Sequence, residues 1–482
     1  MRGNIPKFWL SEILSRSLNS IAFIITARAI GVEAYGLVGY VASIAACLIA
    51  VVQFGSDFIA VRELAGSGKY STSEKADLSS TVIIFRAGLG ILVSMILLLL
   101  GILSNQPMLR FLFWSSMAAV AGMVFPLDAL LQLNLHFGKI AVARFFFSLL
   151  NLVGIALFVN SPQSAWYVPL VSGVSMMIVQ AFLIPRLMRG ARFPGTASLF
   201  RHVRMLVVEG FPLFGSVLLS LLFGQAAIMF LHWFRSPQEL GWYTAGYKVY
   251  DIGTAFIVPA AVMVYPHLAA LSPVGGVERR TNLITNGIRI ATPLAVTFLG
   301  LALLGAKEFL PAVFGPRFDT SSQFVEVLAI ALVFRSVSMF LANTLIAIKK
   351  QVTNFVIMAV VTVLNLTIGY LAVVWFGPMG AAVMTVFTFV VELSLLSIVL
   401  RDHVSLGSII GSAVNVALIG FGMFLAALLL KGLINAVFHD PLLAAGSGCA
   451  VFVALFMSVL FFIGTLNSEF IRSNLAGNSI QS

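Results

Sequence analysis

The stretch RAIGVEAYGLVGYVASIAACLIAVVQFGSDFIAVREL, residues 28–64, decides the fold of this chain. It contains the end of one apolar segment, a short turn from Gly31 to Gly36, and a second apolar segment that closes on Asp57, Arg62 and Glu63. A helix needs about 20 apolar residues to span the hydrocarbon core of a bilayer. Two such segments joined by so short a turn predict a helical hairpin that crosses the membrane and returns.

The composition of the whole chain extends this reading. Of its 482 residues, 60% are apolar and 10% are charged, whereas a typical soluble domain has about 25% charged residues. The apolar runs are longer than the alternating segments of about 10 residues that mark a transmembrane β-barrel. Backbone groups in lipid must bond within their own segment, so each run is expected to be helical. The sequence predicts an all-α, polytopic membrane protein with about 14 transmembrane helices.

The predicted spans cover residues 8–30, 37–61, 79–103, 110–134, 141–159, 165–187, 205–233, 241–270, 282–305, 322–347, 352–375, 379–400, 406–430 and 441–466. Glu12, Arg16 and Asn19 interrupt the first apolar run, so we expect a retained first helix rather than a cleaved signal peptide.

Lys and Arg residues orient these spans. With the N-terminus in the cytoplasm, 18 of the 29 Lys and Arg residues fall in inner connections and six within spans, when Arg110, Arg144 and Arg186 near span ends are counted with the adjoining connections. The five in outer connections are Arg110, Arg235, Lys307, Arg317 and Lys431. Cytoplasmic loops carry the excess of positive charge. The formal charge of +11 is therefore assigned to the cytoplasmic membrane edge rather than to nucleic-acid binding. We expect a multi-pass protein of the bacterial inner membrane with both termini cytoplasmic.

Three matches between distant parts of the chain predict an internal repeat. They pair Gly36 with Gly241, Arg86 with Arg289, and residues 150–152 with residues 364–366. The predicted organisation is two six-helix bundles related by a pseudo-two-fold repeat, 1–187 and 205–402, joined by a basic cytoplasmic linker, 188–204. Two additional helices and a tail, 403–482, follow.

Basic residues inside spans are the candidate substrate-binding residues. A charged side chain at the bilayer centre costs about 2.5–3.5 kcal/mol on insertion scales, so it usually faces a partner or a cavity. Arg335 lies nearest the middle of its span. Arg28, beside the first turn, is open between snorkelling to the interface and contacting substrate. The candidates for a polar cavity are Arg28, Arg86, Lys248, Arg289 and Arg335, and Arg16 is expected to be structural.

Acidic residues inside spans are the candidates for ion coupling. The three candidates are Asp128, Asp251 and Glu392, each of which has a second reading as the partner of a nearby Arg or Lys. Lys248 and Asp251 are three residues apart and are expected to share a helix face. Asp57 is open between a helix cap and a cavity group. Mid-span amides at Asn151 and Asn365 are expected to hydrogen-bond between helices.

Enzyme, cofactor and metal motifs are missing from the sequence. It contains no glycine-rich phosphate loop, HExxH, CxxC or nucleophile elbow. Cys47 and Cys449 lie in apolar segments without a metal-ligand or disulfide pattern. No connection is long enough for a soluble catalytic domain. We expect a protein that is not an enzyme and has no cofactor or metal.

The first hairpin resembles the opening of polysaccharide exporters of the multidrug/oligosaccharidyl-lipid/polysaccharide flippase superfamily. Those proteins share a Leu/Ile-Gly-x-x-x-Tyr-Gly turn followed by a glycine and an Arg-Glu-x-Ala sequence. The matching residues here are Ile30, Gly31, Tyr35, Gly36, Gly55, Arg62, Glu63 and Ala65. The layout of fourteen spans is similar to the O-antigen flippase branch.

The resemblance implies a flippase for an undecaprenyl-diphosphate-linked oligosaccharide, the repeat unit of an O-antigen or another lipopolysaccharide or exopolysaccharide glycan. It implies movement from the cytoplasmic to the periplasmic leaflet by alternating access, with H+ or Na+ as a coupling ion and other polysaccharide assembly proteins as partners. The alternatives are a multidrug antiporter of the same superfamily and a membrane glycosyltransferase or polysaccharide polymerase. The lipid II flippase is a close relative within the transporter reading.

Overall fold

The computed structural model describes residues 5–65, 72–125, 137–187, 193–271 and 276–462. Within these residues every regular element is helical. Ten helices in this described part of the chain are long and apolar enough to cross a membrane. Large apolar side chains point outward from them, including Phe182 at 76% exposure and Leu429 at 72%, as expected of surfaces that face lipid. The all-α membrane fold predicted from the sequence is therefore confirmed, while the count of fourteen spans stays a prediction.

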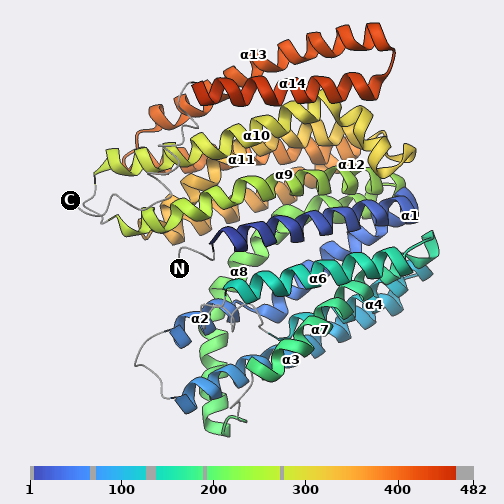
Figure 1. The fold of residues 1–482 in the computed structure, drawn as a ribbon. Helices are drawn as coiled ribbons and strands as arrows, with labels where there is room; N and C mark the ends of the chain where they lie inside the picture. Colours follow the sequence, from blue (N-terminus) through green and yellow to red (C-terminus); the bar gives the residue numbers. More distant parts are fainter. Residues whose placement is uncertain (1–4, 66–71, 126–136, 188–192, 272–275, 463–482) are drawn as a thin grey trace. The chain divides into compact units, whose positions relative to one another are not determined.

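Two of the ten helices each contain two helical segments. The break in α1 (Ile5–Gln53) is at Gly31, where φ is 77° and ψ is 176°. The break in α12 (Gln351–Leu400) is at Gly377, where φ is 61°, and Pro378 follows. A positive φ is readily adopted only by glycine. Both breaks fall between adjacent predicted spans, and Figure 1 shows the chain running out along the first arm of α1 and returning along the second.

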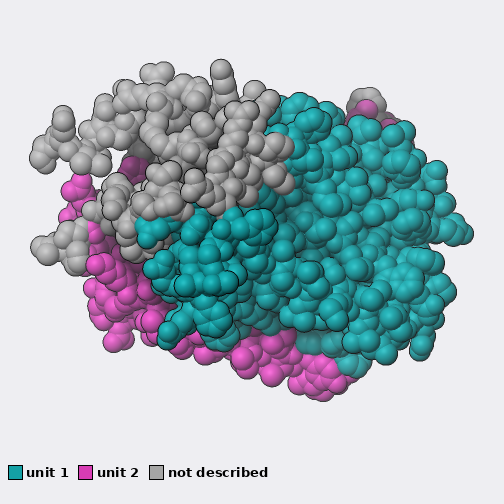
Figure 2. All heavy atoms as spheres, turned by 90° about the horizontal axis from the view of Figure 1, so that it is seen from below, with its two compact units in different colours: residues 1–241 teal, residues 242–482 magenta. Residues whose placement is uncertain are grey.

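The chain divides into two compact units, Met1–Gly241 and Trp242–Ser482, which Figure 2 colours separately. The predicted domain boundaries at 187, 204 and 402 stay a prediction. Helix α8 begins at Thr196, inside the stretch predicted as a linker.

The first unit contains α1 and the helices that pack around its two arms. These are α2 (Ser56–Ala65), α3 (Thr72–Leu103), α4 (Pro107–Met123), α6 (Phe137–Phe158), the short η1 (Pro162–Trp166), α7 (Tyr167–Leu187) and α8 (Thr196–Phe234). Helix α1 packs on α6 and α8, and α4 packs on α7. Asn151 of α6 accepts a hydrogen bond of 2.9 Å from the Ser172 hydroxyl of α7, as its mid-span position predicts.

Two glycines allow α1 to approach the first turn of α9 (Pro237–Ala270) within the first unit. A Cβ atom on Gly36 would lie 2.7 Å from the backbone nitrogen of Gly241, and one on Gly241 would overlap the carbonyl oxygen of Val32. These glycines are the pair that the sequence matched as repeat partners. Only glycine at both positions lets the two backbones touch.

The second unit contains most of α9 and six further elements. These are α10 (Val277–Phe314), the short η2 (Pro316–Phe318), α11 (Ser321–Ala347), α12, α13 (Leu406–Phe438) and α14 (Pro441–Phe462). Helix α11 packs on both α10 and α12, and α13 and α14 pack on α10. Phe452 and Phe456 of α14 form the core of the contact with α10, where Gly300 leaves room for the Phe452 ring. Asn365 donates a hydrogen bond of 3.2 Å to Thr388 across the two arms of α12, matching the prediction.

Candidate functional site

The described part of the first unit contains one deeply buried basic side chain among the predicted cavity residues, Arg86 of α3. It is 2% exposed, its Nη2 atom lies 2.7 Å from Oδ1 of Asp57, and its Nε donates a hydrogen bond of 2.7 Å to the Ser56 hydroxyl. Ser56 and Asp57 open α2 directly after Gly55, whose φ of 67° separates α2 from α1. The guanidinium charge is thus neutralised locally, and Arg86 ties the start of α2 to α3.

Arg335 in the second unit is placed very differently. It lies near the midpoint of α11, with its Cζ atom 5.2 Å from the centroid of the Phe389 ring on the second arm of α12. In the part of the chain that the structure describes, its guanidinium has no hydrogen-bond or ion-pair partner. A guanidinium carries five N–H donors in a fixed fork. Those donors are therefore available to an anionic ligand, with the aromatic ring supporting the plane of the guanidinium.

Glu392 lies one turn beyond Phe389 on the same arm of α12. It is 7% exposed, and its Oε2 atom accepts a hydrogen bond of 3.0 Å from Ser338, which is three residues after Arg335 on α11. Arg335 interacts electrostatically with Glu392 and with Asp251. Opposite charges are therefore present in the same region of the second unit, but the Arg335–Glu392 pair is not closed to ion-pair distance.

Helix α9 contributes a second pair of charges to this region. Lys248 Nζ lies 3.6 Å from Asp251 Oδ2, as their spacing in the sequence predicts, and the side chains are 28% and 42% exposed. Three buried tyrosines on the same helix, spaced four and three residues apart, contact one another through their rings. The ring centroids of Tyr243 and Tyr247 are 6.0 Å apart, and those of Tyr247 and Tyr250 are 5.6 Å apart. We refer to Lys248, Asp251, Arg335, Phe389 and Glu392 as the charged cluster.

Two further predicted cavity residues, Arg28 and Arg289, are exposed. Arg28 lies just before the Gly31 break, and Arg289 lies on α10. The sequence matched Arg289 with Arg86, yet one is exposed and the other is 2% exposed, so the matched positions have different surroundings. Asp128 lies outside the described residues. The roles predicted for these side chains stay predictions.

Lys431 of α13 is a further cation inside a helix that the sequence did not predict, and its side chain is 21% exposed. Lys431 was assigned to an outer connection, but α13 continues to Phe438 and contains it. Its Nζ atom lies 2.8 Å from Oε1 of Glu308 and donates a hydrogen bond of 2.6 Å to the carbonyl oxygen of Leu304. Neutralisation by Glu308 of α10 explains why the helix extends through a charged residue.

The sequence also did not predict the roles of Phe389 and Ser338, although each lies three residues from a charged candidate on its own helix.

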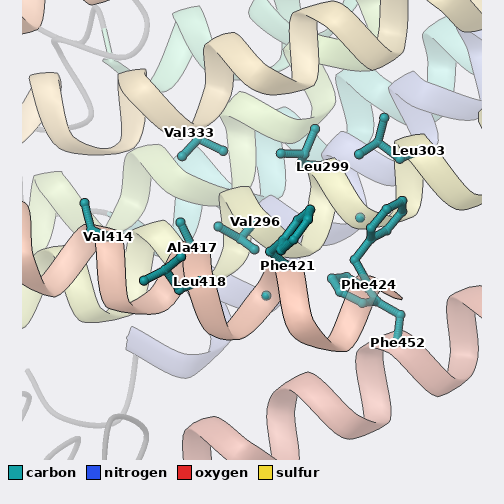
Figure 3. A pocket seen from close by; sticks show the side chains of 12 residues that line it. Val296, Leu299, Leu303, Val333, Val414, Ala417, Leu418, Phe421, Phe424 and Phe452 are labelled. Carbon is teal, nitrogen blue, oxygen red and sulfur yellow. The ribbon is translucent and has the colours of Figure 1, made fainter. Parts of the chain in front are cut away.

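A cavity of about 390 Å³ lies beside α10, α11, α13 and α14 in the second unit (Figure 3). Its lining is apolar and includes Val296, Leu303, Val333, Phe421 and Phe452. It offers no charged group to a diphosphate and no hydroxyl to a sugar. The polar chemistry of the second unit is therefore carried by the charged cluster and not by this cavity.

Comparison with known proteins places the chain among glycan-handling membrane proteins. The family model described as "Polysaccharide biosynthesis protein" matches residues 4–272, more than half of the chain. The "Probable low-salt glycan biosynthesis flippase Agl15" of Haloferax volcanii is 26% identical over 174 residues, which make up 36% of this chain and 37% of that protein. The match thus spans little more than a third of this relative's length.

Solved structures share the fold. "Lipid II flippase MurJ, inward closed conformation" aligns with a TM-score of 0.75 at 16% identity and covers 94% of this chain and 98% of its own. An inward-facing multidrug resistance transporter of the MATE family in the MOP superfamily aligns with a TM-score of 0.65 at 16% identity, covering 80% and 94%. These likenesses establish the fold. The family match over residues 4–272 confirms the resemblance to polysaccharide exporters drawn from the first hairpin. The chain belongs to the polysaccharide biosynthesis protein family of membrane proteins.

Proposed function

We propose that this protein is a flippase that moves an undecaprenyl-diphosphate-linked oligosaccharide from the cytoplasmic to the periplasmic leaflet of a bacterial inner membrane. In this proposal both termini are cytoplasmic, the protein works by alternating access, and it is not an enzyme. The cargo is the repeat unit of an O-antigen, another lipopolysaccharide glycan or an exopolysaccharide. The family assignment and the names of two similar proteins, a glycan biosynthesis flippase and a lipid II flippase, support a lipid-linked glycan as cargo.

The observation that carries the proposal is the open guanidinium of Arg335. A diphosphate and its sugars cannot cross hydrocarbon without a polar path, because an isolated charge in an apolar medium is strongly disfavoured. A guanidinium fork binds phosphate oxygens through two parallel N–H donors. Arg335 lies at mid-helix, rests on the Phe389 ring, and has no partner among the described residues. A substrate anion would supply the partner that the protein leaves out.

The neighbouring charges fit a transporter of this kind. Lys248 adds a second cation near Arg335, and its pair with Asp251 leaves both side chains partly exposed. The carboxylates of Asp251 and Glu392 are the candidates for coupling to H+ or Na+. The isoprenoid tail would remain in the lipid phase while the head group passes the charged cluster. Other polysaccharide assembly proteins would supply the lipid-linked unit and elongate it after transfer.

The direct test is Arg335→Gln in a strain whose own copy of the gene is deleted. We expect surface glycan to fall to the level of the deletion strain, with lipid-linked repeat units accumulating in the cytoplasmic leaflet and with unchanged protein in the membrane. The matched control is Arg401→Gln, because Arg401 is 71% exposed at the end of α12. Normal glycan display in the Arg335 variant would refute the proposal. Accumulation of single units in the outer leaflet of the deletion strain would instead indicate a polymerase.

A further inference from the structure

Two helices of the second unit present matched pairs of residues to each other. Arg335 and Ser338 are three residues apart on α11, and Phe389 and Glu392 are three residues apart on α12. Residues at this spacing lie on the same helix face. Arg335 lies over the Phe389 ring, and Ser338 donates its hydrogen bond to Glu392. The face of α12 that supports the guanidinium therefore also carries a carboxylate one turn away.

The carboxylate of Glu392 is incompletely bonded for a buried charge. Among the described residues, its one hydrogen-bond donor is the Ser338 hydroxyl at 3.0 Å, although an ionised carboxylate can accept several hydrogen bonds. The groups that interact with it electrostatically are Arg335 on α11 and Tyr250 on α9. Asp251, the other acid near Arg335, already has Lys248 at 3.6 Å and is 42% exposed. Glu392 is thus the more deeply buried of the two anions near Arg335.

We propose that Glu392 is a built-in counter-anion of Arg335, with which the diphosphate of the substrate must compete. This inference rests on the proposed function, since it assigns a regulatory partner to the same anion site. In the empty transporter the negative charge of Glu392, one helical turn after Phe389 on α12, partly offsets the positive charge of Arg335 on α11. The hydrogen bond from Ser338 keeps the Glu392 carboxylate from forming an ion pair with the guanidinium. A bound diphosphate takes the open N–H donors and is repelled by Glu392. The repulsion lowers affinity and speeds release in the second leaflet.

The test is the affinity of the purified full-length protein, in lipid nanodiscs, for farnesyl diphosphate as a soluble isoprenoid diphosphate. Glu392→Gln keeps the size of the side chain and removes the charge, so we expect binding about tenfold tighter than wild type. Arg335→Gln should weaken binding at least about tenfold. The double variant should bind as the Arg335 variant does, because the effect of Glu392 acts through Arg335. Asp402→Asn, which removes a 77% exposed charge just after α12, is the matched control and should bind as wild type.

A second variant should change the affinity for farnesyl diphosphate in the opposite direction, by letting Glu392 pair with Arg335. Ser338→Ala removes the hydrogen bond that holds Glu392 away from the guanidinium. We expect its affinity for farnesyl diphosphate to fall about threefold, and this variant decides the question if the Glu392 variant fails to fold. Unchanged or weaker binding by Glu392→Gln, or unchanged binding by Ser338→Ala, would overturn the inference.

Failure of the inference can be told from failure of the proposed function. If wild type binds the probe and Arg335→Gln abolishes glycan display, but Glu392→Gln binds as wild type, Glu392 is not the counter-anion and the flippase proposal stands. If wild type does not bind the probe and Arg335→Gln displays normal glycan, both proposals are wrong.

Discussion

Arg86 and Arg335 are the same side chain, each inside a membrane-spanning helix, and the protein treats them in opposite ways. Arg86 is 2% exposed and has a carboxylate at 2.7 Å and a hydroxyl at 2.7 Å. Arg335 has an aromatic ring at 5.2 Å and, within the described residues, neither a carboxylate nor a hydroxyl at bonding distance. A buried arginine is therefore not in itself a sign of a binding site. What separates the two is whether the protein brings a carboxylate to bonding distance of the guanidinium.

The difference follows from local structure. The partner of Arg86 comes from the break at Gly55, which starts a new helix so that Ser56 and Asp57 lie in its first turn. A carboxylate is favourable there because the N-terminus of a helix carries a partial positive charge. The second arm of α12 continues without a break past Arg335, and it presents Phe389 at the level of the guanidinium and Glu392 one turn further on. One arginine completes an ion pair, and the other is left with open donors.

The strongest test of this comparison is Arg86→Gln. Removing one partner of a fully buried ion pair leaves the other charge unpaired and costs about 3–5 kcal/mol. Asp57, the charge left behind here, is 36% exposed, so the expected cost lies at the lower end of that range. We expect a large loss of stability, measured by thermal or denaturant unfolding of the purified protein, and less protein in the membrane. Asp57→Asn should be at least as harmful, because it leaves the 2% exposed guanidinium unpaired, and the double variant should be more stable than the sum of the single losses predicts. A stable Arg86 variant that has lost transport would mean that Arg86 binds substrate, as we propose for Arg335, and is not a structural residue.

Lys431, a third cation inside a membrane-spanning helix, resembles Arg86 because the protein supplies its carboxylate partner. Lys431 has both Glu308 and the Leu304 carbonyl within bonding distance. Hydrogen bonds to charged groups contribute about 1.5–3 kcal/mol each, so Lys431→Gln should lower stability by about that amount. Glycan display should fall only as far as the amount of folded protein falls. Lys307→Gln is the matched control, since Lys307 is an exposed lysine of α10, and its unfolding should be unchanged. A Lys431 variant of normal stability that exports no glycan would show that a cation paired by the protein can still be required for transport, contrary to the distinction drawn between Arg86 and Arg335.

The sequence predicted the helical membrane fold and the two hairpin breaks, because apolar length and glycine position are properties of a single segment. It also marked Arg335 and Glu392 as charges within apolar spans for the same reason. It did not predict which acid meets which base. Asp57 was open between a cap and a cavity group, and it is the partner of Arg86. Lys431 was counted as a connection residue, and it pairs with Glu308 of another helix.

These pairings depend on the register between helices, which hydropathy does not encode. Arg86 and Arg289 were matched by their depth in successive halves, yet only Arg86 meets the start of α2. Asn151 and Asn365 were matched in the same way, and both are 7% exposed and bonded between helical segments. An uncharged amide finds a partner on almost any neighbouring helix. A charge requires a specific partner, so its surroundings change with small shifts of register.

The smallest and most specific effect concerns the ring beneath Arg335. If the open guanidinium is held by Phe389, a double-mutant cycle on unfolding stability with Arg335→Gln and Phe389→Leu should give a coupling of about 0.5–1 kcal/mol, the usual size of a cation–π contact. The matched cycle with Phe387→Leu should give none, because Phe387 lies two residues away and is 46% exposed. Phe389→Leu should also reduce glycan export severalfold, since the fork is no longer held flat for two phosphate oxygens. A coupling above about 3 kcal/mol would belong to a buried ion pair and would mean that Arg335 is held as firmly as Arg86. A coupling near zero would mean that Phe389 does not hold the guanidinium of Arg335, and the proposed role of the ring would be wrong.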